Sequence, residues 1–265
     1  MMGTQVQTDM KNHPETSRVA VVTGGAAGIG AAIVEQLASD GFVVGVADIN
    51  GSAAADVAAR VTENGGQAFA LQIDVGDAGS IETAFAKLEQ TYGRCDVLVN
   101  NAGIAGTFPL IDYPLDHWKR VVEINITGPL LCSQAAARLM RKANWGRIVN
   151  IASISGVRAS VGRAAYGTSK AALIGFTRQM AVELAELGIT ANCVAPGPID
   201  TPLTRDHHTP ATRDAYHRTV PMKRYGQPSE IAATVGFLCS DGASYVNGQI
   251  IAVDGGFLAA GLLEI

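Results

Sequence analysis

Tyr166 and Lys170 lie four positions apart in the stretch AAYGTSKAA, residues 164–172. Four positions are slightly more than one helical turn, so the two side chains share one face of a helix. A phenol with a pKa near 10 is a poor base at neutral pH. An ammonium about 5 Å away, at an effective dielectric constant of about 20, stabilises the phenolate by roughly 3 kcal/mol, or about two pKa units. The pair therefore predicts a tyrosine acid or base with a lowered pKa; the alternative is a surface helix on which the two residues align by chance.

Ser153 and Asn125 are the next candidates for chemistry. Ser153 ends the apolar run GRIVNIAS (146–153), thirteen residues before Tyr166. Its hydroxyl can donate a hydrogen bond to a developing carbonyl or alkoxide oxygen, although such a serine can also cap a helix or turn. Asn125 falls inside an apolar helical pattern, where a buried amide is costly unless it is hydrogen-bonded. The alternative for Asn125 is backbone capping at a helix kink.

A glycine-rich turn follows the first apolar run and precedes a helical pattern. Gly24, Gly28 and Gly30 have the spacing GxxxGxG, which differs from the GxGxxG of the usual dinucleotide fingerprint. A turn of this kind lets backbone amides and a helix N-terminus approach a pyrophosphate closely. The alternative is that the glycines only permit a tight turn.

Asp48 ends the second apolar run, 18 residues after Gly30. A carboxylate at this place can accept hydrogen bonds from both hydroxyls of the adenosine ribose and would repel a 2′-phosphate. Neither the glycine turn nor the residues directly after Asp48 contain Lys or Arg. The sequence therefore favours NAD over NADP, unless Asp48 is only a solvated helix cap.

Elements that alternate between strand and helix must position these residues. Apolar runs with little polar alternation are typical of parallel strands covered on both faces, and the helical patterns between them predict right-handed crossovers. The expected fold is α/β: one Rossmann-type domain over residues 18–265, with a doubly wound parallel sheet of about seven strands and helices on both faces. The expected strands are 18–23, 42–48, 67–73, 95–101, 146–153, 188–196 and 248–254.

Two segments fall outside this alternation. Residues 1–17 have no apolar core of the signal-peptide type, and we expect a frayed tail there. Residues 198–228 are polar, carry prolines and have no clear strand, which indicates an inserted lid over the substrate.

Composition narrows the function classes. The chain has 265 residues, 17% charged and 48% hydrophobic, which indicates a compact globular protein. A net charge of −4 without a basic run argues against a nucleic-acid surface. Glycines interrupt the longest uncharged run near the N-terminus, so no membrane span is expected. Four scattered cysteines without a CxxC pattern predict buried thiols in a reducing cytoplasm.

The motifs together resemble the short-chain dehydrogenase/reductase family from about Arg18 to Phe257. They occur in the family's order, and the thirteen-residue separation of Ser153 and Tyr166 is the usual one there. The motifs are TGGAAGIG (23–30), DV (74–75), NNAG (100–103), EINITG with Asn125, NIAS with Ser153, YGTSK (166–170), PGPIDT (196–201) and DGG (254–256).

The resemblance implies a nicotinamide-dependent enzyme that interconverts alcohols and carbonyls. It implies a catalytic set of Asn125, Ser153, Tyr166 and Lys170, in which Asn125 holds a water that links Lys170 to solvent. Ser153 and Tyr166 would bind the substrate. The cofactor would contact Gly24, Gly28, Ile29, Gly30, Asp48, Asp74, Val75, Asn101, Ala102, Gly103, Tyr166, Lys170, Pro196, Gly197, Ile199 and Thr201.

The same resemblance suggests a homo-oligomer, a tetramer or a dimer. A stripe at helical spacing follows Tyr166: Leu173, Phe176 or Thr177, Met180, Leu184 and Leu187. In the family, part of this surface commonly forms the dimer seam, although we expect the stripe to be mainly core.

Some polar residues remain without an assigned role. Arg158 and Arg163 lie between Ser153 and Tyr166, where they would meet an anionic substrate or form an ordinary salt bridge. His207 and His208 have no further ligands at a recognisable spacing, so a solvated lid is favoured over a metal site, and no metal is expected.

The sequence thus predicts an NAD-dependent oxidoreductase that acts on a secondary alcohol or its ketone, with no nucleic-acid or membrane partner. The alternatives are an NADPH-dependent reductase of 3-oxoacyl thioesters, against which Asp48 argues, and a nucleotide-binding protein without catalysis. The identity of the substrate, its stereochemistry and the physiological direction stay open.

Overall fold

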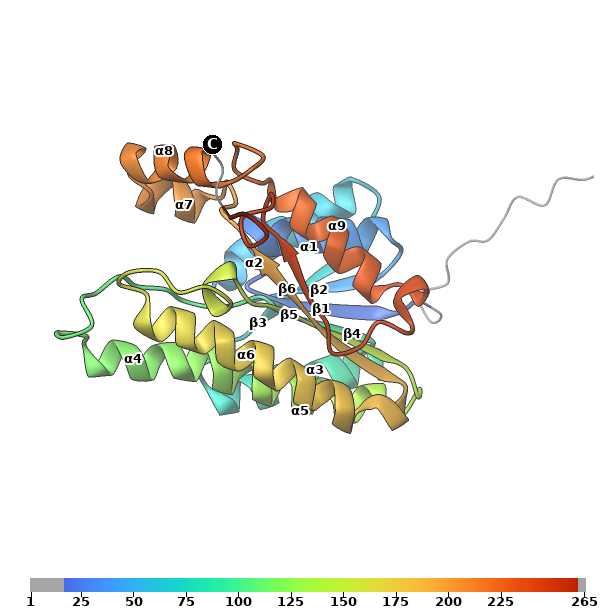
Figure 1. The fold of residues 1–265 in the computed structure, drawn as a ribbon. Coiled ribbons are helices and arrows are strands. Elements are labelled where there is room, and N and C mark those ends of the chain that lie inside the picture. The colour runs from blue at the N-terminus through green and yellow to red at the C-terminus, as the bar shows by residue number, and fades with distance from the viewer. Residues whose placement is uncertain (1–16, 262–265) are drawn as a thin grey trace, which may run out of the picture.

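The sheet has seven parallel strands in the order β3-β2-β1-β4-β5-β6-β7 (Figure 1). The computed structural model describes residues 17–261, except for the side chains at positions 203 and 207. All seven expected strands are present, and each is shorter than expected by one to three residues. They are β1 (Val19–Thr23), β2 (Val43–Asp48), β3 (Gln67–Gln72), β4 (Val97–Asn100), β5 (Gly146–Ile151), β6 (Ile189–Pro196) and β7 (Ile250–Val253).

Helices cover both faces of the sheet, which confirms the doubly wound fold (Figure 1). Helices α1, α2 and α9 lie on one face, and α3, α5 and α6 lie on the other. The helices are α1 (Gly28–Ser39), α2 (Gly51–Glu63), α3 (Ala78–Tyr92), α4 (Leu115–Val122), α5 (Gly128–Met140), α6 (Ala164–Glu183), α7 (Pro202–His207), α8 (Pro210–Thr219) and α9 (Pro228–Cys239).

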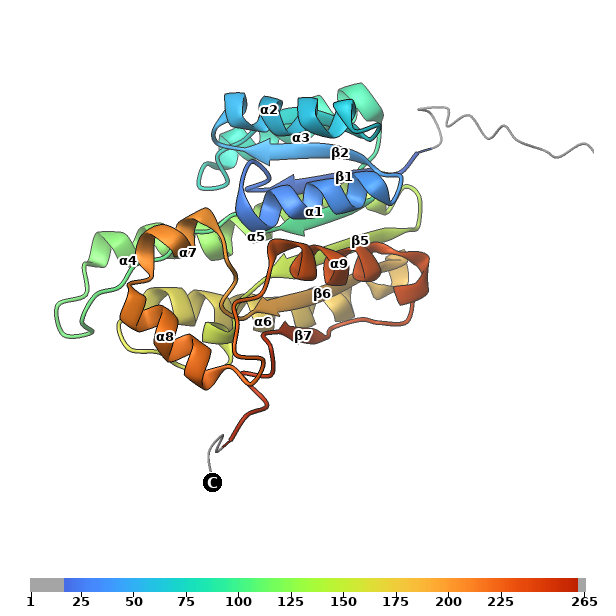
Figure 2. The same cartoon turned by 90° about the horizontal axis from the view of Figure 1, so that it is seen from above.

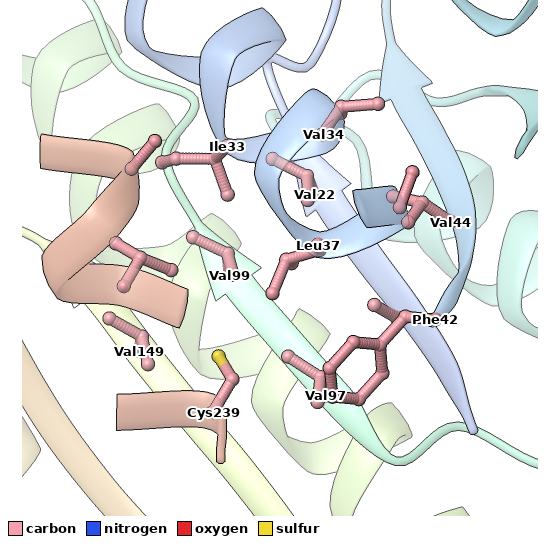
Figure 3. Packing of buried hydrophobic residues seen from close by; sticks show 14 of the residues in the cluster. Val22, Ile33, Val34, Leu37, Phe42, Val44, Val97, Val99, Val149 and Cys239 are labelled. Atoms are coloured by element: carbon pink, nitrogen blue, oxygen red, sulfur yellow. The ribbon is translucent and has the colours of Figure 1, made fainter. Parts of the chain in front are cut away.

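Two apolar layers hold the helices on the sheet, one on each face. On the α1 side, Ile33, Val34 and Leu37 are fully buried against the strands, with Val22 and Val99 in the same cluster (Figure 3). Burying each such side chain stabilises the fold by about 1.5–3 kcal/mol. The apolar runs in the sequence are uninterrupted because the central strands are covered on both sides.

From β1 the sheet continues through β2 and β3 to one edge, and from β4 it continues through β5, β6 and β7 to the other edge. The strand order therefore reverses between β1 and β4. In sheets of this kind a crevice opens at the carboxyl ends of the strands where the order reverses. Helices α4, α7 and α8 lie at this same end of the molecule (Figure 2). The fold therefore places this crevice beside the candidate residues that lie at or just after the carboxyl ends of the strands.

The segment 198–228 extends from the sheet and contains α7 and α8. Its two ends are joined: the Asp200 amide donates to the Gly226 carbonyl at 2.8 Å, and the Gly226 amide donates to the Pro198 carbonyl at 2.9 Å. These bonds close the base of the segment, so it projects as one unit. Its role as a lid stays a prediction.

The tail expected over residues 1–17 lies outside the described residues, apart from its last residue. Within residues 17–261 no helix has the length and apolar character needed to cross a bilayer. The cysteines Cys95, Cys132, Cys193 and Cys239 are all buried free thiols, as expected.

Candidate active site

A cavity of about 390 Å³ opens at the carboxyl ends of the strands. It is lined by residues from the glycine turn, the end of β4, the end of β5, α6 and the loop after β6. The structure brings together fourteen of the predicted site residues in its wall: Gly24, Gly28, Ile29, Gly30, Asn101, Ala102, Gly103, Ser153, Tyr166, Lys170, Pro196, Gly197, Ile199 and Thr201.

The glycine turn presents an uncapped helix to this cavity. Helix α1 begins at Gly28, and its N-cap Ala27 makes no side-chain hydrogen bond to the first turn. The first amide groups of a helix need partners, and an anion at the N-terminus is stabilised by them. Gly28 faces Thr201, because a Cβ added at Gly28 would lie 3.6 Å from the Thr201 Cγ2 atom. These residues fit a pyrophosphate-bearing dinucleotide.

The amide of Asn101 fixes the glycine turn to the end of β4. Its Nδ2 atom donates to the carbonyl oxygens of Thr23 and Gly24, both at 3.0 Å. The Thr23 hydroxyl in turn accepts from the amides of Asn101 and Ala102 at 3.0 and 3.1 Å. Sequence reasoning did not single out Thr23, although it stands directly before the first glycine.

Asp48 lies beside the glycine turn, as predicted, but outside the wall of the 390 Å³ cavity. One carboxylate oxygen accepts from the Ala26 amide at 3.1 Å, and the other accepts from the Asn50 amide at 3.0 Å. Each oxygen keeps a lone pair, so the carboxylate stays able to accept hydrogen bonds from ribose hydroxyls.

Asp74 and Val75 lie away from this cavity. Asp74 lines a second cavity of about 430 Å³ together with Ile49, the residue after Asp48. The Asp74 carboxylate also pairs with Arg120 at 3.5 Å and accepts from the Gly76 amide at 2.8 Å. The Val75 carbonyl packs against Gly128 at the start of α5. The cofactor contacts expected for both residues stay a prediction.

Tyr166 and Lys170 share one face of α6, as their spacing predicts. The Lys170 Nζ atom lies 5.7 Å from the centroid of the Tyr166 ring. Its hydrogen bond goes to the Ile151 carbonyl at 2.7 Å. Lys170 is buried, and this burial lowers its pKa to about 8. The charge of Lys170 therefore depends on pH in a range closer to neutrality than that of an ordinary lysine.

The expected lowering of the Tyr166 pKa is wrong in direction for the protein by itself. Burial raises the pKa of Tyr166 above its ordinary value, because the phenolate is poorly solvated there. The Ser153 hydroxyl and the Arg163 guanidinium lower that pKa, but by less than burial raises it. Further positive charge at the site is needed for Tyr166 to act as a base at neutral pH.

Ser153 is buried just after β5, and its hydroxyl lowers the pKa of Tyr166. Its oxygen accepts from the Ser155 amide at 3.1 Å. This bond caps the short 3-10 helix η2 (Ile154–Gly156), which was the alternative interpretation of this residue. The cap fixes the serine hydroxyl beside the phenol.

Asn125 is fully buried in the π-helical segment η1 (Glu123–Thr127), between α4 and α5. Its Nδ2 atom donates to the Ile104 carbonyl at 2.9 Å and to the Ser169 hydroxyl at 3.0 Å, and its Oδ1 accepts from the Ile104 amide at 2.9 Å. Ser169 also donates to the Tyr166 carbonyl at 2.8 Å. Asn125 thus braces the loop after β4 against α6, and its role in a proton relay stays a prediction. Ser169 was missed by sequence reasoning.

The residues without an assigned role contact aromatic side chains. The Arg163 guanidinium lies 5.5 Å from the centroid of the Tyr166 ring, and the Arg158 guanidinium lies 5.6 Å from that of Phe257. The His208 Nδ1 atom lies 2.9 Å from the Tyr225 hydroxyl, and its ring stacks on Tyr216. The side chain of His207 lies outside the described residues.

Known proteins resemble the chain over nearly its full length. Residues 24–258 match the family model described as enoyl-(acyl carrier protein) reductase. A 3-oxoacyl-[acyl-carrier-protein] reductase of Synechocystis sp. is 42% identical over 92% of this chain and 98% of its own length. The cis-4-hydroxycyclohexanecarboxylate dehydrogenase of Sinomonas cyclohexanicum is 42% identical over 91% of this chain and 97% of its own.

A solved structure gives the same result. The gluconate 5-dehydrogenase of Burkholderia cenocepacia, in complex with NADP and tartrate, superimposes with a TM-score of 0.89 and 34% identity over 92% of this chain and 96% of its own. Fold, motif order and relatives agree. The chain therefore belongs to the short-chain dehydrogenase/reductase family and is an oxidoreductase.

Proposed function

We propose that this protein interconverts a secondary alcohol and its ketone with NAD or NADH, and that Tyr166 is the general acid and base. The observation that carries the proposal is the placement of the Ser153 hydroxyl and the Tyr166 phenol in one cavity wall with the glycine turn. A substrate oxygen held by both hydroxyls would then lie beside the place that the turn and the loop after β6 offer to a dinucleotide.

Each catalytic residue has a distinct task in this mechanism. A nicotinamide held in this cavity would supply the acceptor or donor of the hydride and, in its oxidised form, a positive charge. Ser153 donates a hydrogen bond to the substrate oxygen, which favours the charge that develops on it. Tyr166 removes the hydroxyl proton during oxidation and returns it during reduction. The Lys170 ammonium stabilises the phenolate from one helical turn away.

Asp48 supports the choice of NAD. Its carboxylate is anchored to the glycine turn through the Ala26 amide. Lys and Arg are absent from the turn and the start of the helix after it (24–34) and from the residues that follow Asp48 (49–59). A 2′-phosphate at this place would meet a negative charge without a cation to balance it.

For the substrate, the relatives favour a second candidate, a 3-oxoacyl thioester, over a simple secondary alcohol. Several of the curated relatives are named 3-oxoacyl-[acyl-carrier-protein] reductases. A 3-oxoacyl thioester is itself a ketone, so the same four residues would reduce it by the same steps. The relative named for a hydroxycyclohexanecarboxylate supports the small alcohol instead.

One set of steady-state rates tests cofactor and substrate separately. The purified enzyme is assayed for reduction of acetoacetyl-CoA with NADH and with NADPH, and for oxidation of a panel of secondary alcohols with NAD and with NADP. We expect a preference for NAD or NADH of at least tenfold with whichever substrate is turned over. A preference for NADPH would overturn the cofactor proposal, and cofactor binding without any turnover would support a non-catalytic protein.

We also propose that the protein is a homo-oligomer. Leu173, Thr177 and Met180 of the helical stripe are buried in the core. Val182 of α6 and Phe237 of α9, on opposite faces of the sheet, stay exposed by 77% and 49%, and each is a candidate for a separate contact between subunits. Light scattering on the purified protein tests this, and a mass of one chain would contradict it.

A further inference from the structure

The segment between β5 and α6 carries two arginines, Arg158 and Arg163. Arg163 is half-buried at the N-cap position of α6, and its guanidinium lies 5.5 Å from the centroid of the Tyr166 ring. Arg158 is exposed, and its guanidinium lies 5.6 Å from the centroid of Phe257. The sequence left both residues between a substrate contact and an ordinary salt bridge.

The described part of the chain does not form the ordinary salt bridge that was the alternative role of these two arginines. Within residues 17–261, neither arginine forms an ion pair, whereas nearby Arg205 and Arg213 both pair with Asp200 at 2.9 and 3.1 Å. Arg163 therefore holds a positive charge beside the reacting phenol, without a carboxylate from the described chain to balance it.

The backbone fixes the position of Arg163. Its carbonyl accepts from the Gly167 amide at 2.7 Å in the first turn of α6. The preceding residue, Gly162, has a φ of +76°, and its carbonyl accepts from the Phe108 amide at 3.1 Å. A Cβ at Gly162 would lie 2.6 Å from the Thr107 Cγ2 atom, so the two loops meet closely here. The backbone at Arg163 is therefore held by these hydrogen bonds and by the close packing of the two loops.

We propose that Arg163 binds a carboxylate of the substrate, so that the enzyme prefers a hydroxy acid and its oxo acid over an uncharged alcohol and ketone. A half-buried guanidinium loses part of its hydration and is stabilised when an anion binds to it. Its planar fork matches a carboxylate with two parallel hydrogen bonds. Because the reacting oxygen must lie at the Tyr166 hydroxyl, the carboxylate is separated from the carbinol carbon by only a few bonds.

This inference rests on the proposed hydride transfer at Tyr166 and favours the small alcohol over the thioester as substrate. Arg158 provides the matched control, since it belongs to the same loop and carries the same charge. It lies beside Phe257 rather than beside Tyr166. If the loop acted only through the general electric field of its positive charges, loss of either arginine would have a similar effect on the preference for the acid. If the carboxylate contacts Arg163 directly, only the loss of Arg163 would remove that preference.

The test compares matched acids and amides as substrates. Initial rates with NAD are measured for 3-hydroxybutyrate and 4-hydroxycyclohexanecarboxylate and for the carboxamide of each. The enzymes are the wild type, Arg163→Gln, Arg163→Lys and Arg158→Gln. We expect the wild type to prefer at least one acid by tenfold or more in kcat/KM.

The variants separate a direct contact from a field effect. Arg163→Gln should reduce kcat/KM for the preferred acid by about 10- to 100-fold relative to the amide, mainly through KM. Loss of the Arg163 charge also raises the pKa of Tyr166, and this should change kcat for acid and amide alike. Arg163→Lys should restore part of the loss, and Arg158→Gln should change the ratio by less than threefold. Equal rates for acid and amide in the wild type, or equal losses in both arginine variants, would overturn the proposal.

A binding measurement keeps the proposal testable if none of these alcohols is turned over. The complex of enzyme and NADH is titrated with cyclohexanecarboxylate and with cyclohexanecarboxamide in a calorimeter. Preferential binding of the acid that disappears in Arg163→Gln supports the inference even if the proposed reaction fails. Turnover of acetoacetyl-CoA or of neutral alcohols, together with no preference for the acid in either assay, overturns the inference and leaves the proposed reaction intact.

Discussion

The Lys170 ammonium and the Tyr166 phenol lie on one face of α6, with the Nζ atom 5.7 Å from the ring centroid, but the hydrogen bond of the lysine goes to the Ile151 carbonyl. In the proposed mechanism the lysine would therefore act on the phenol through space rather than by direct contact. Its effect depends on its own charge, which burial makes pH-dependent because it lowers the Lys170 pKa to about 8. Two predictions follow from this arrangement, one for catalysis and one for stability.

The substitution Tyr166→Phe should remove the acid and base and leave the cofactor cavity intact. Positioned proton transfer contributes about 10²- to 10⁴-fold to a rate, so kcat should fall by at least about a hundredfold. The NADH dissociation constant, measured by fluorescence, should change by less than threefold. Tyr92→Phe is the control, because Tyr92 stacks on Phe69 away from the site. Full turnover by Tyr166→Phe would refute the proposed mechanism.

The substitution Lys170→Met should reveal the cost of burying the ammonium. The folded-state pKa of about 8 lies below the ordinary value of 10.5, so the unfolded chain binds more protons between these two values. Stability then rises with pH across this window, by up to about 3 kcal/mol for one such group. Below pH 8 the penalty is present in full, and above pH 10.5 it is absent.

Urea unfolding of both proteins at pH 7, 8, 9 and 10 measures this difference, since other titrating groups cancel between them. The wild type should gain stability relative to Lys170→Met as pH rises from about 8. A difference that stays constant over this range would show that Lys170 keeps an ordinary pKa in the folded protein.

The sequence predicted the fold and the outline of the site well, because both depend on local pattern. Continuous apolar runs marked the strands, and the spacing of Tyr166 and Lys170 placed them on one helix face. The ends of strands were predicted less accurately where a side chain, rather than the backbone of a neighbouring strand, forms the hydrogen bond. The buried Asp96 carboxylate, for example, accepts from the Val19 amide at 2.7 Å directly before β4, where a strand from residue 95 was expected.

The parts that the sequence could not predict depend on contacts between distant segments. Asn125 bonds to Ile104 and Ser169, which lie 21 and 44 positions away, and Thr23 bonds to Asn101 across 78 positions. No local pattern encodes such pairs. The direction of the Tyr166 pKa was also inaccessible, because it depends on how deeply the surrounding structure buries the phenol.

The substitution Asp48→Ala should relax the choice between NAD and NADP. It removes acceptors for the ribose hydroxyls and the charge that repels a 2′-phosphate, so the ratio of kcat/KM for NAD over NADP should fall by at least about tenfold. Asp56→Asn is the control, since Asp56 is an exposed acid on α2 whose loss changes the net charge in the same way. An unchanged ratio in Asp48→Ala would show that Asp48 does not contact the ribose.

The substitution Gly30→Ala should damage the glycine turn itself. A Cβ at Gly30 would collide with the Gly24 carbonyl oxygen and lie 2.7 Å from the Asn101 Nδ2 atom, so the turn must open. Overpacking of this kind costs about 1–3 kcal/mol, and we expect the midpoint of thermal unfolding to fall and NADH binding to weaken by at least tenfold.

Gly175→Ala in α6 is the matched control, because a Cβ there meets nothing within 4 Å. Alanine is a better helix former than glycine by about 1 kcal/mol, so this variant should be as stable as the wild type or more stable, with unchanged NADH binding. If Gly30→Ala bound NADH as the wild type does, the close approach of the glycine turn to the cofactor would be refuted. Loss of binding in Gly30→Ala with retained folding, against no loss in Gly175→Ala, would instead locate the dinucleotide at the N-terminus of α1.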